Sequence, residues 1–165
     1  MGSLKLQVYV TKRNGVKETL DLEKFHRVAS FACSDLAGVS SSELEIKTHL
    51  QVYDNIKTID IQETLIKAAS ELISEEQPNY QYVAGRLINY ALRKEVYGQF
   101  EPISLAEHII TCISNFHYDP VLMDSYTLED MQQLNGHINH ERDLDLTYAA
   151  MEQMRGKYLV KNRVT

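Results

Sequence analysis

An Asn14-Gly15 pair near the start of this 165-residue chain is the feature that most restricts its fold. Both residues of a tight hairpin turn need positive φ, which Asn and Gly adopt at low cost. Val8 and Val10 precede the pair as strand-like residues, and Leu20 follows it. The sequence therefore predicts a β-hairpin, and Asp21 after the second strand is a credible helix N-cap.

Three cations accompany this hairpin. Lys12 and Arg13 stand at the turn, and Lys24 falls in the first turn of the predicted helix. Cations near a hairpin tip and a helix N-terminus can hold a chain of phosphates. Taken alone, the hairpin is better explained as a solvated one whose charges serve solubility, because hairpin turns are commonly polar.

The net charge, the apolar runs and the cysteines of the chain argue against several classes of protein. A net charge of −6 is unusual for a general nucleic-acid binder. No apolar run approaches the ~20 residues that a membrane span needs, and no signal-peptide pattern follows Met1. Cys33 and Cys112 lie in helix-like apolar stretches, as expected for reduced thiols of a cytoplasmic protein. The last residues read as the middle of a longer protein, so we expect a fragment.

Apolar residues at helical spacing predict four helices after the hairpin. The expected limits are Asp21 to a stop at Gly38, a Ser40–Glu43 capping box to about Tyr53, a helix capped by Thr58, and Asn79 to Tyr97 ended by Gly98. The predicted fold is α+β and mostly α, with a small hairpin or sheet as a lid over a four-helix bundle. No clear candidate for a third strand is visible.

Beyond Phe100–Pro102 the chain predicts further helices. One runs from about Ser104 to Phe116, a turn follows at Asp119-Pro120, a second helix is capped by Thr127, and another helical stretch begins near Asp143. No P-loop, nucleophile elbow or Cys-x-x-Cys motif occurs.

Two side-chain pairs stand about one helical turn apart, a spacing that can serve binding. His137 and His140 have a spacing that suits a metal, but no third ligand is evident, so a polar junction is expected and no metal site from protein side chains. Tyr90 and Lys94 stand at i, i+4. An aromatic ring beside an ammonium suits a purine nucleotide, whereas packing is the ordinary explanation.

Five short segments carry a family resemblance: Val10–Gly15, Asp54–Thr58, Ile66–Ala69, Tyr80–Leu87 and Tyr97–Pro102. In this order they resemble the N-terminal portion of the large (α) subunit of aerobic class Ia ribonucleotide reductases. The resemblance implies an ATP-cone, an allosteric domain, over residues 5–98. It implies a helical lead-in to a catalytic ten-stranded barrel over residues 99–165, where His140–Asp143 and Gly156–Val160 also match.

The resemblance further implies a site for ATP, which favours the active enzyme, or dATP, which favours an inactive state, with Mg²⁺ on the phosphates. Lys12, Arg13, Lys24 and Lys94 would be the triphosphate cations. Glu18 and Asp21 would face the adenine and sugar, Thr58 would lie at a helix N-terminus, and Val10, Phe25 and Tyr90 would form the walls. The complete expected set is Val10, Lys12, Arg13, Asn14, Glu18, Thr19, Leu20, Asp21, Leu22, Glu23, Lys24, Phe25, Thr58, Gln62, Tyr90 and Lys94.

Three positions depart from the pattern of the best-known bacterial members. Gln62 and Ala91 each stand where a histidine is expected, and Asp21 replaces an asparagine. Discrimination between ATP and dATP is therefore expected to differ here.

The family implies that the intact protein reduces ribonucleoside diphosphates for DNA replication, using a radical from a small (β) subunit. Its partners would be the nucleotide, the rest of the α subunit, the dimer mate and the β subunit. Cys33 and Cys112 do not match the catalytic cysteines, so this stretch alone should be inactive. One alternative is a zinc-ribbon repressor, which would need Cys-x-x-Cys pairs before the cone, and these are absent from the sequence. The other is a degenerate cone that serves only as a subunit-interaction module, and the retained cations speak against it.

Overall fold

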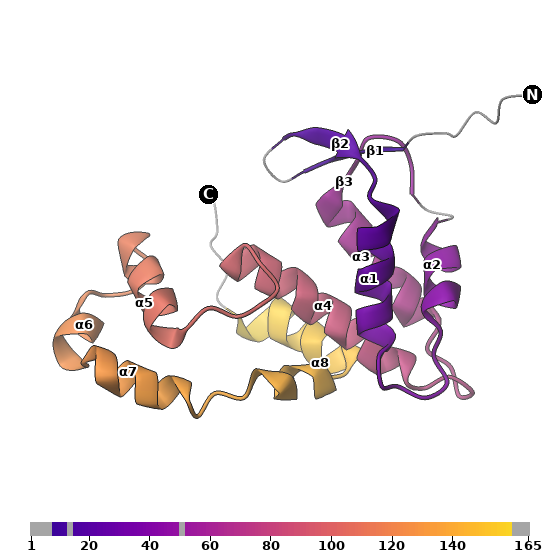
Figure 1. The fold of residues 1–165 in the computed structure, drawn as a ribbon. Helices are drawn as coiled ribbons and strands as arrows, with labels where there is room; N and C mark the ends of the chain where they lie inside the picture. The colour runs from indigo at the N-terminus through magenta and orange to yellow at the C-terminus, as the bar shows by residue number, and fades with distance from the viewer. Residues whose placement is uncertain (1–7, 13–14, 50–51, 160–165) are drawn as a thin grey trace, which may run out of the picture. The chain divides into compact units, whose positions relative to one another are not determined.

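The computed structural model describes residues 8–12, 15–49 and 52–159 (Figure 1). Compactness divides the chain into two units: Met1–Ala91 with Leu144–Thr165, and Leu92–Asp143. Each unit is described by itself. No helix among the described residues combines the length and apolar character needed to cross a bilayer.

A three-stranded sheet in the order β2-β1-β3 opens the first unit. β1 (Tyr9–Thr11) pairs antiparallel with β2 (Lys17–Thr19), and Val10 stands opposite Glu18. β3 (Ile56–Lys57) pairs in parallel with β1, Val10 beside Ile56 and Thr11 beside Lys57. β3 is the third strand for which the sequence offered no candidate, because two residues are too few to show a strand period.

The predicted hairpin is present, but its loop is longer than a two-residue turn. The Lys12 N–H donates to the Val16 carbonyl at 2.8 Å, and the Gly15 N–H donates to the Lys12 carbonyl at 2.9 Å. Lys12 and Val16 therefore close a loop of three residues. Gly15, the last of the three, takes the left-handed conformation with φ +82°. This pattern is the bulged three-residue hairpin, in which glycine serves the left-handed position. Asn14, like Arg13, lies outside the described residues.

Three helices follow in the first unit before α4. α1 (Leu22–Cys33) is capped by Asp21, as predicted, and the Asp21 carboxylate accepts from the Lys24 N–H at 3.0 Å. α2 (Ser41–His49) packs against α1 and α3 (Thr58–Glu71), which starts directly after β3. In Figure 1 α1 and α3 both begin at the sheet and run away from it.

Three predicted limits of these helices are wrong. α1 ends at Cys33 and not at Gly38, because Ser34 turns its N–H and hydroxyl back to the Phe31 carbonyl and Asp35 has φ +57°. α2 ends at His49, short of Tyr53. Thr58 is the first residue of α3 and not its cap; Lys57 holds the cap position without a side-chain hydrogen bond.

The predicted capping box before α2 is half formed. The Glu43 N–H donates to the Ser40 hydroxyl at 3.3 Å. The Glu43 carboxylate instead accepts from the Tyr80 hydroxyl at 2.8 Å, and the Ser40 N–H donates to the same hydroxyl at 3.0 Å. Tyr80, fully buried, thus joins the start of α4 to the start of α2.

α4 (Tyr80–Tyr97) is the longest helix described and ends before Gly98, which has φ +71°, as predicted. Its first part closes the core of the first unit. The buried apolar side chains of that core come from β1, β3, α1–α4 and α8: Val10, Phe25, Ala29, Ala32, Leu44, Ile56, Ile61, Leu65, Ile66, Ala68, Ala69, Tyr80, Val83, Ala84, Leu87, Ile88 and Met151.

The end of the chain returns to α4. α8 (Tyr148–Gln153) is capped by Thr147 and continues as a π-helical turn, Met154–Tyr158. Gly85 of α4 lies so close to this segment that a Cβ there would overlap the Leu146 carbonyl. Buried Arg86 donates to the Leu144 carbonyl at 3.1 Å and to the Ser34 carbonyl at 2.6 Å. The guanidinium thereby ties residue 144 to the end of α1.

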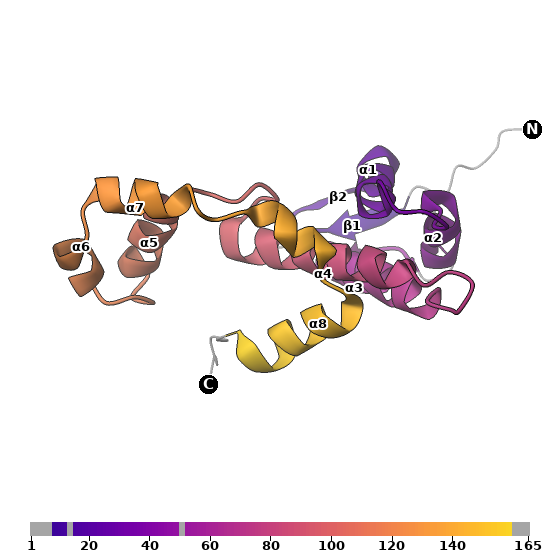
Figure 2. The ribbon, with the colours of Figure 1, turned by 90° about the horizontal axis from the view of Figure 1, so that it is seen from below.

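The second unit holds α5 (Leu105–Ser114), α6 (Val121–Ser125), α7 (Leu128–Asn135) and a 3-10 turn, His140–Asp145, that runs past the unit boundary. α5 packs against α7, and Figure 2 shows the two side by side. Ser104 caps α5, near the predicted start of that helix. Thr127 caps α7, as predicted, and forms a full capping box with Asp130. Buried Arg93 donates to the His140 carbonyl and the Asp143 carboxylate.

Candidate functional site

Side-chain alternation along the hairpin places part of the predicted site on one face of the sheet. Val10 and Ile56 are almost fully buried, so the face they share looks toward the helices. Lys12 follows Val10 by two residues and Glu18 stands opposite Val10, so both extend from that inner face. Their charged groups meet at 2.6 Å, with both side chains about 40% exposed.

Thr19 lies on the opposite, outer face of β2 and is exposed, as is Lys17. Leu20, next along the chain, donates its N–H to the Val8 carbonyl at 2.8 Å and is half-buried. That bond closes the open end of the hairpin, two residues before α1 begins. The N-cap residue Asp21 and the first-turn residues Glu23 and Lys24 are exposed there.

The start of α3 is brought to β1 by the parallel pairing of β3. Thr11 is paired with Lys57, so the next residues along the two chains, Lys12 and Thr58, come out at the same end of this strand pair. The first N–H groups of a helix have no partner within the helix and carry partial positive charge. Because Lys57 provides no side-chain cap, these N–H groups stand without a side-chain acceptor at the same end of β1 as Lys12, whose charge is paired with Glu18.

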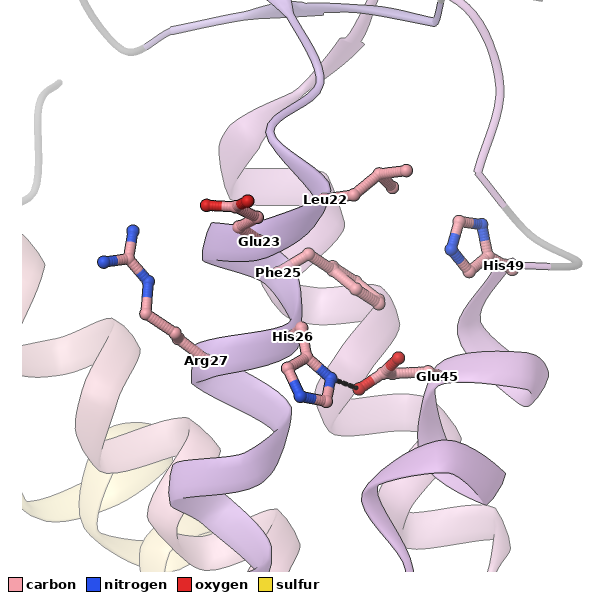
Figure 3. Close-up of a pocket in the computed structure, with 7 residues that line it drawn as sticks. All are labelled: Leu22, Glu23, Phe25, His26, Arg27, Glu45 and His49. Carbon is pink, nitrogen blue, oxygen red and sulfur yellow. Dashed lines mark hydrogen bonds and ion pairs between the residues drawn. The ribbon is translucent and has the colours of Figure 1, made fainter. Parts of the chain in front are cut away.

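A second feature is an open hollow of about 470 Å³ between α1 and α2 (Figure 3). Leu22 and Phe25 point from α1 toward His49 of α2, and the Phe25 and His49 rings lie 5.5 Å apart. His26 at its edge contacts the Glu45 carboxylate through Nδ1 at 2.7 Å.

The hollow contains three predicted residues, Leu22, Glu23 and Phe25, and four that the sequence did not indicate: His26, Arg27, Glu45 and His49. His26 and His49 read as surface histidines from their neighbours. Their meeting depends on how α1 packs against α2, which sequence spacing within either helix does not reveal.

The structure therefore assembles the predicted residues in groups. Lys12 and Glu18 are in contact, Thr58 starts α3 beside them, and Leu22 with Phe25 turns toward α2. Gln62 and Tyr90 are half-buried on α3 and α4, and Lys94 follows Tyr90 by one turn of α4. Arg13 and Asn14 belong to the expected set but lie outside the described residues.

Among the described residues, no group of three or more His, Cys, Asp or Glu is placed to hold a metal ion. His140 contacts Asp143 at 3.9 Å, and His137 does not join them. Cys33 is half-buried in α1, where burial raises the pKa of its thiol to about 11. A thiol that holds its proton so firmly is a poor nucleophile near neutral pH.

Comparison with known proteins places these features in a family. A sequence profile of the ATP cone domain matches residues 8–95, which include the sheet, α1–α3 and most of α4. The chain is 49% identical over 156 residues to the ribonucleoside-diphosphate reductase 1 subunit alpha of Escherichia coli K12, covering 94% of this chain and 20% of that protein.

Two further relatives are similar in extent. The ribonucleoside-diphosphate reductase subunit alpha of Haemophilus influenzae is 47% identical over 156 residues, covering 94% of this chain and 21% of that protein. The ribonucleoside-diphosphate reductase subunit alpha of enterobacteria phage T4 is 42% identical over 160 residues, covering 96% of this chain and 21% of that protein. The chain thus spans about a fifth of the length of these relatives. Because the profile covers more than half of it, the chain belongs to the ATP cone domain family.

Proposed function

We propose that this chain is the allosteric region of a ribonucleoside-diphosphate reductase α subunit and that it binds ATP or dATP beside the hairpin. The observation that carries the proposal is the meeting of Lys12 with Glu18 on the inner face of the sheet, next to the uncapped start of α3, within a matched ATP cone domain.

The triphosphate would be held by charge. Lys12, Arg13, Lys24 and Lys94 supply four cations, and the first turn of α3 at Thr58 adds backbone donors. Charged hydrogen bonds of this kind contribute about 1.5–3 kcal/mol each. Mg²⁺ would reach the site with the phosphates, since it is usually bound through phosphate oxygens and one or two carboxylates.

Glu18 would change partner when nucleotide binds. It now holds Lys12 in an ion pair. In the proposed complex a phosphate takes over the Lys12 ammonium, and the freed Glu18 carboxylate accepts a hydrogen bond from the adenine amino group. Val10, Phe25 and Tyr90 would border the base. Asp21, Gln62 and Ala91 are proposed to alter the discrimination between ATP and dATP.

The longer protein is proposed to reduce ribonucleoside diphosphates together with a β subunit and a second α subunit. Residues 5–98 would bind the effector, and residues 99–165 would lead toward the catalytic barrel. Coupling between the two would act through subunit assembly. By itself this chain is proposed to have no reductase activity.

Calorimetry of ATP binding to two lysine variants tests the site. Lys12→Met removes a cation on the inner face of the sheet and should raise the Kd for ATP at least tenfold. Lys17→Met is the matched control, because Lys17 lies on the outer face of the neighbouring strand. Its Kd should stay within about twofold of the wild type, after the small effect of net charge. Equal losses in both variants, or none in either, would instead favour a module that only contacts other subunits.

A further inference from the structure

A side chain outside the expected set holds the start of β3 against β1. The Asp54 carboxylate accepts from the Tyr9 N–H at 2.8 Å through Oδ1 and from the Asn55 side-chain amide at 2.7 Å through Oδ2. Asn55, with φ +63°, donates its own N–H to the Tyr9 carbonyl at 2.8 Å. Both backbone groups of Tyr9 are therefore bonded to this Asp54-Asn55 turn.

This contact sets the register of a very short strand. Beyond it, β3 is paired with β1 only at Val10–Ile56 and Thr11–Lys57, and α3 then starts at Thr58. A slip of one residue would move Ile56 out of the core and Thr58 away from the end of β1. The Asp54 carboxylate stands in for a strand carbonyl at the point where the ladder begins, and so excludes that slip.

We propose that Asp54 is a positioning residue for the effector site, an inference that rests on the function proposed above. It touches no nucleotide. By locking Tyr9, it keeps the first turn of α3 beside Lys12, so that both contact the same phosphates. Asp54 is exposed, and its contribution to the core is correspondingly small.

Calorimetry with ATP on three variants of the chain separates positioning from general stability. Asp54→Ala removes the acceptor and should raise the Kd at least fivefold. Asp54→Asn keeps a carbonyl oxygen that can accept from the Tyr9 N–H, so its Kd should return to within about twofold of the wild type. Asn79→Ala is the matched control: Asn79 also makes one long-range bond, to the Ala37 carbonyl at 2.8 Å, at the start of α4. Its Kd should not change.

Hydrogen exchange of the wild-type chain gives a readout that does not depend on whether Asp54→Ala folds. The Tyr9 amide hydrogen should exchange more slowly when ATP is bound, because bound ATP should stabilise the Asp54–Tyr9 hydrogen bond along with the effector site. Equal ATP affinity in Asp54→Ala and wild type, failure of Asp54→Asn to restore binding, or a Tyr9 amide indifferent to ATP would each overturn the inference. Absence of ATP binding in the wild type would overturn the proposed function itself.

Discussion

The pairing of Lys12 with Glu18 shows how far the position of a single side chain follows from the sequence. Strand alternation alone places both on the face of Val10 once the hairpin register is known. Their contact at 2.6 Å was not predicted as an ion pair, because the sequence shows two separate charges six residues apart. The three-residue loop sets the register of β1 against β2, and this register brings the two charges together.

Tyr80 illustrates a residue whose environment changes its titration. Burial raises the pKa of its hydroxyl to about 12, although the hydrogen bond from the Ser40 N–H opposes that rise. Because the folded pKa lies above the ordinary value of 10.0, the stabilising contribution is complete below about pH 10 and is lost as the pH rises through about 12.

Tyr80→Phe should therefore lower the free energy of unfolding by about 1–2 kcal/mol at pH 7, through the lost bonds to Ser40 and Glu43. The difference between wild type and variant should shrink from pH 10 upward. Urea unfolding at a series of pH values measures both effects. A difference that stays constant up to pH 12 would contradict this account of the hydroxyl.

At the scale of elements, helices with local signals were predictable and their ends were less so. Asp21 and Thr127 are predicted as caps and cap α1 and α7 in the structure, because a cap needs only its own first turn. The end of α1 at Cys33 follows from a local turn at Ser34 and Asp35 that the sequence pattern did not reveal, whereas the two residues of β3 depend on pairing with β1, far along the chain. The hollow between α1 and α2 was likewise invisible, since it needs residues from both helices.

Gly85 tests how closely the returning segment is packed on α4. Alanine in a helix interior usually stabilises by about 1 kcal/mol relative to glycine. Here the new Cβ would overlap the Leu146 carbonyl, so Gly85→Ala should destabilise by about 1–3 kcal/mol.

Gly156→Ala is the matched control, because no atom beyond its chain neighbours and its own helical backbone lies within 4 Å of a Cβ at that position. Its stability should be unchanged or slightly higher by the same urea measurement. If Gly85→Ala proved as stable as the control, the close approach of Leu146 to α4 would be refuted.

At the scale of the whole molecule, the fold class was predictable from the sequence: a small sheet followed by helices, within the ATP cone domain family. The sequence did not predict that the chain returns to the first unit at Leu144. Arg86 and Gly85 carry no sequence signal for their distant partners, the Leu144 and Leu146 carbonyls. The proposed nucleotide site likewise draws on residues from β1 to α4, which lie far apart in the sequence.

The most direct test of the central claim is an amide NMR titration of this chain with ATP. The account predicts saturable shifts at Lys12, Glu18, Lys24 and Thr58, with α5–α7 unaffected. Shifts confined to α5–α7, or no shifts at millimolar ATP, would contradict the proposed effector site beside the hairpin.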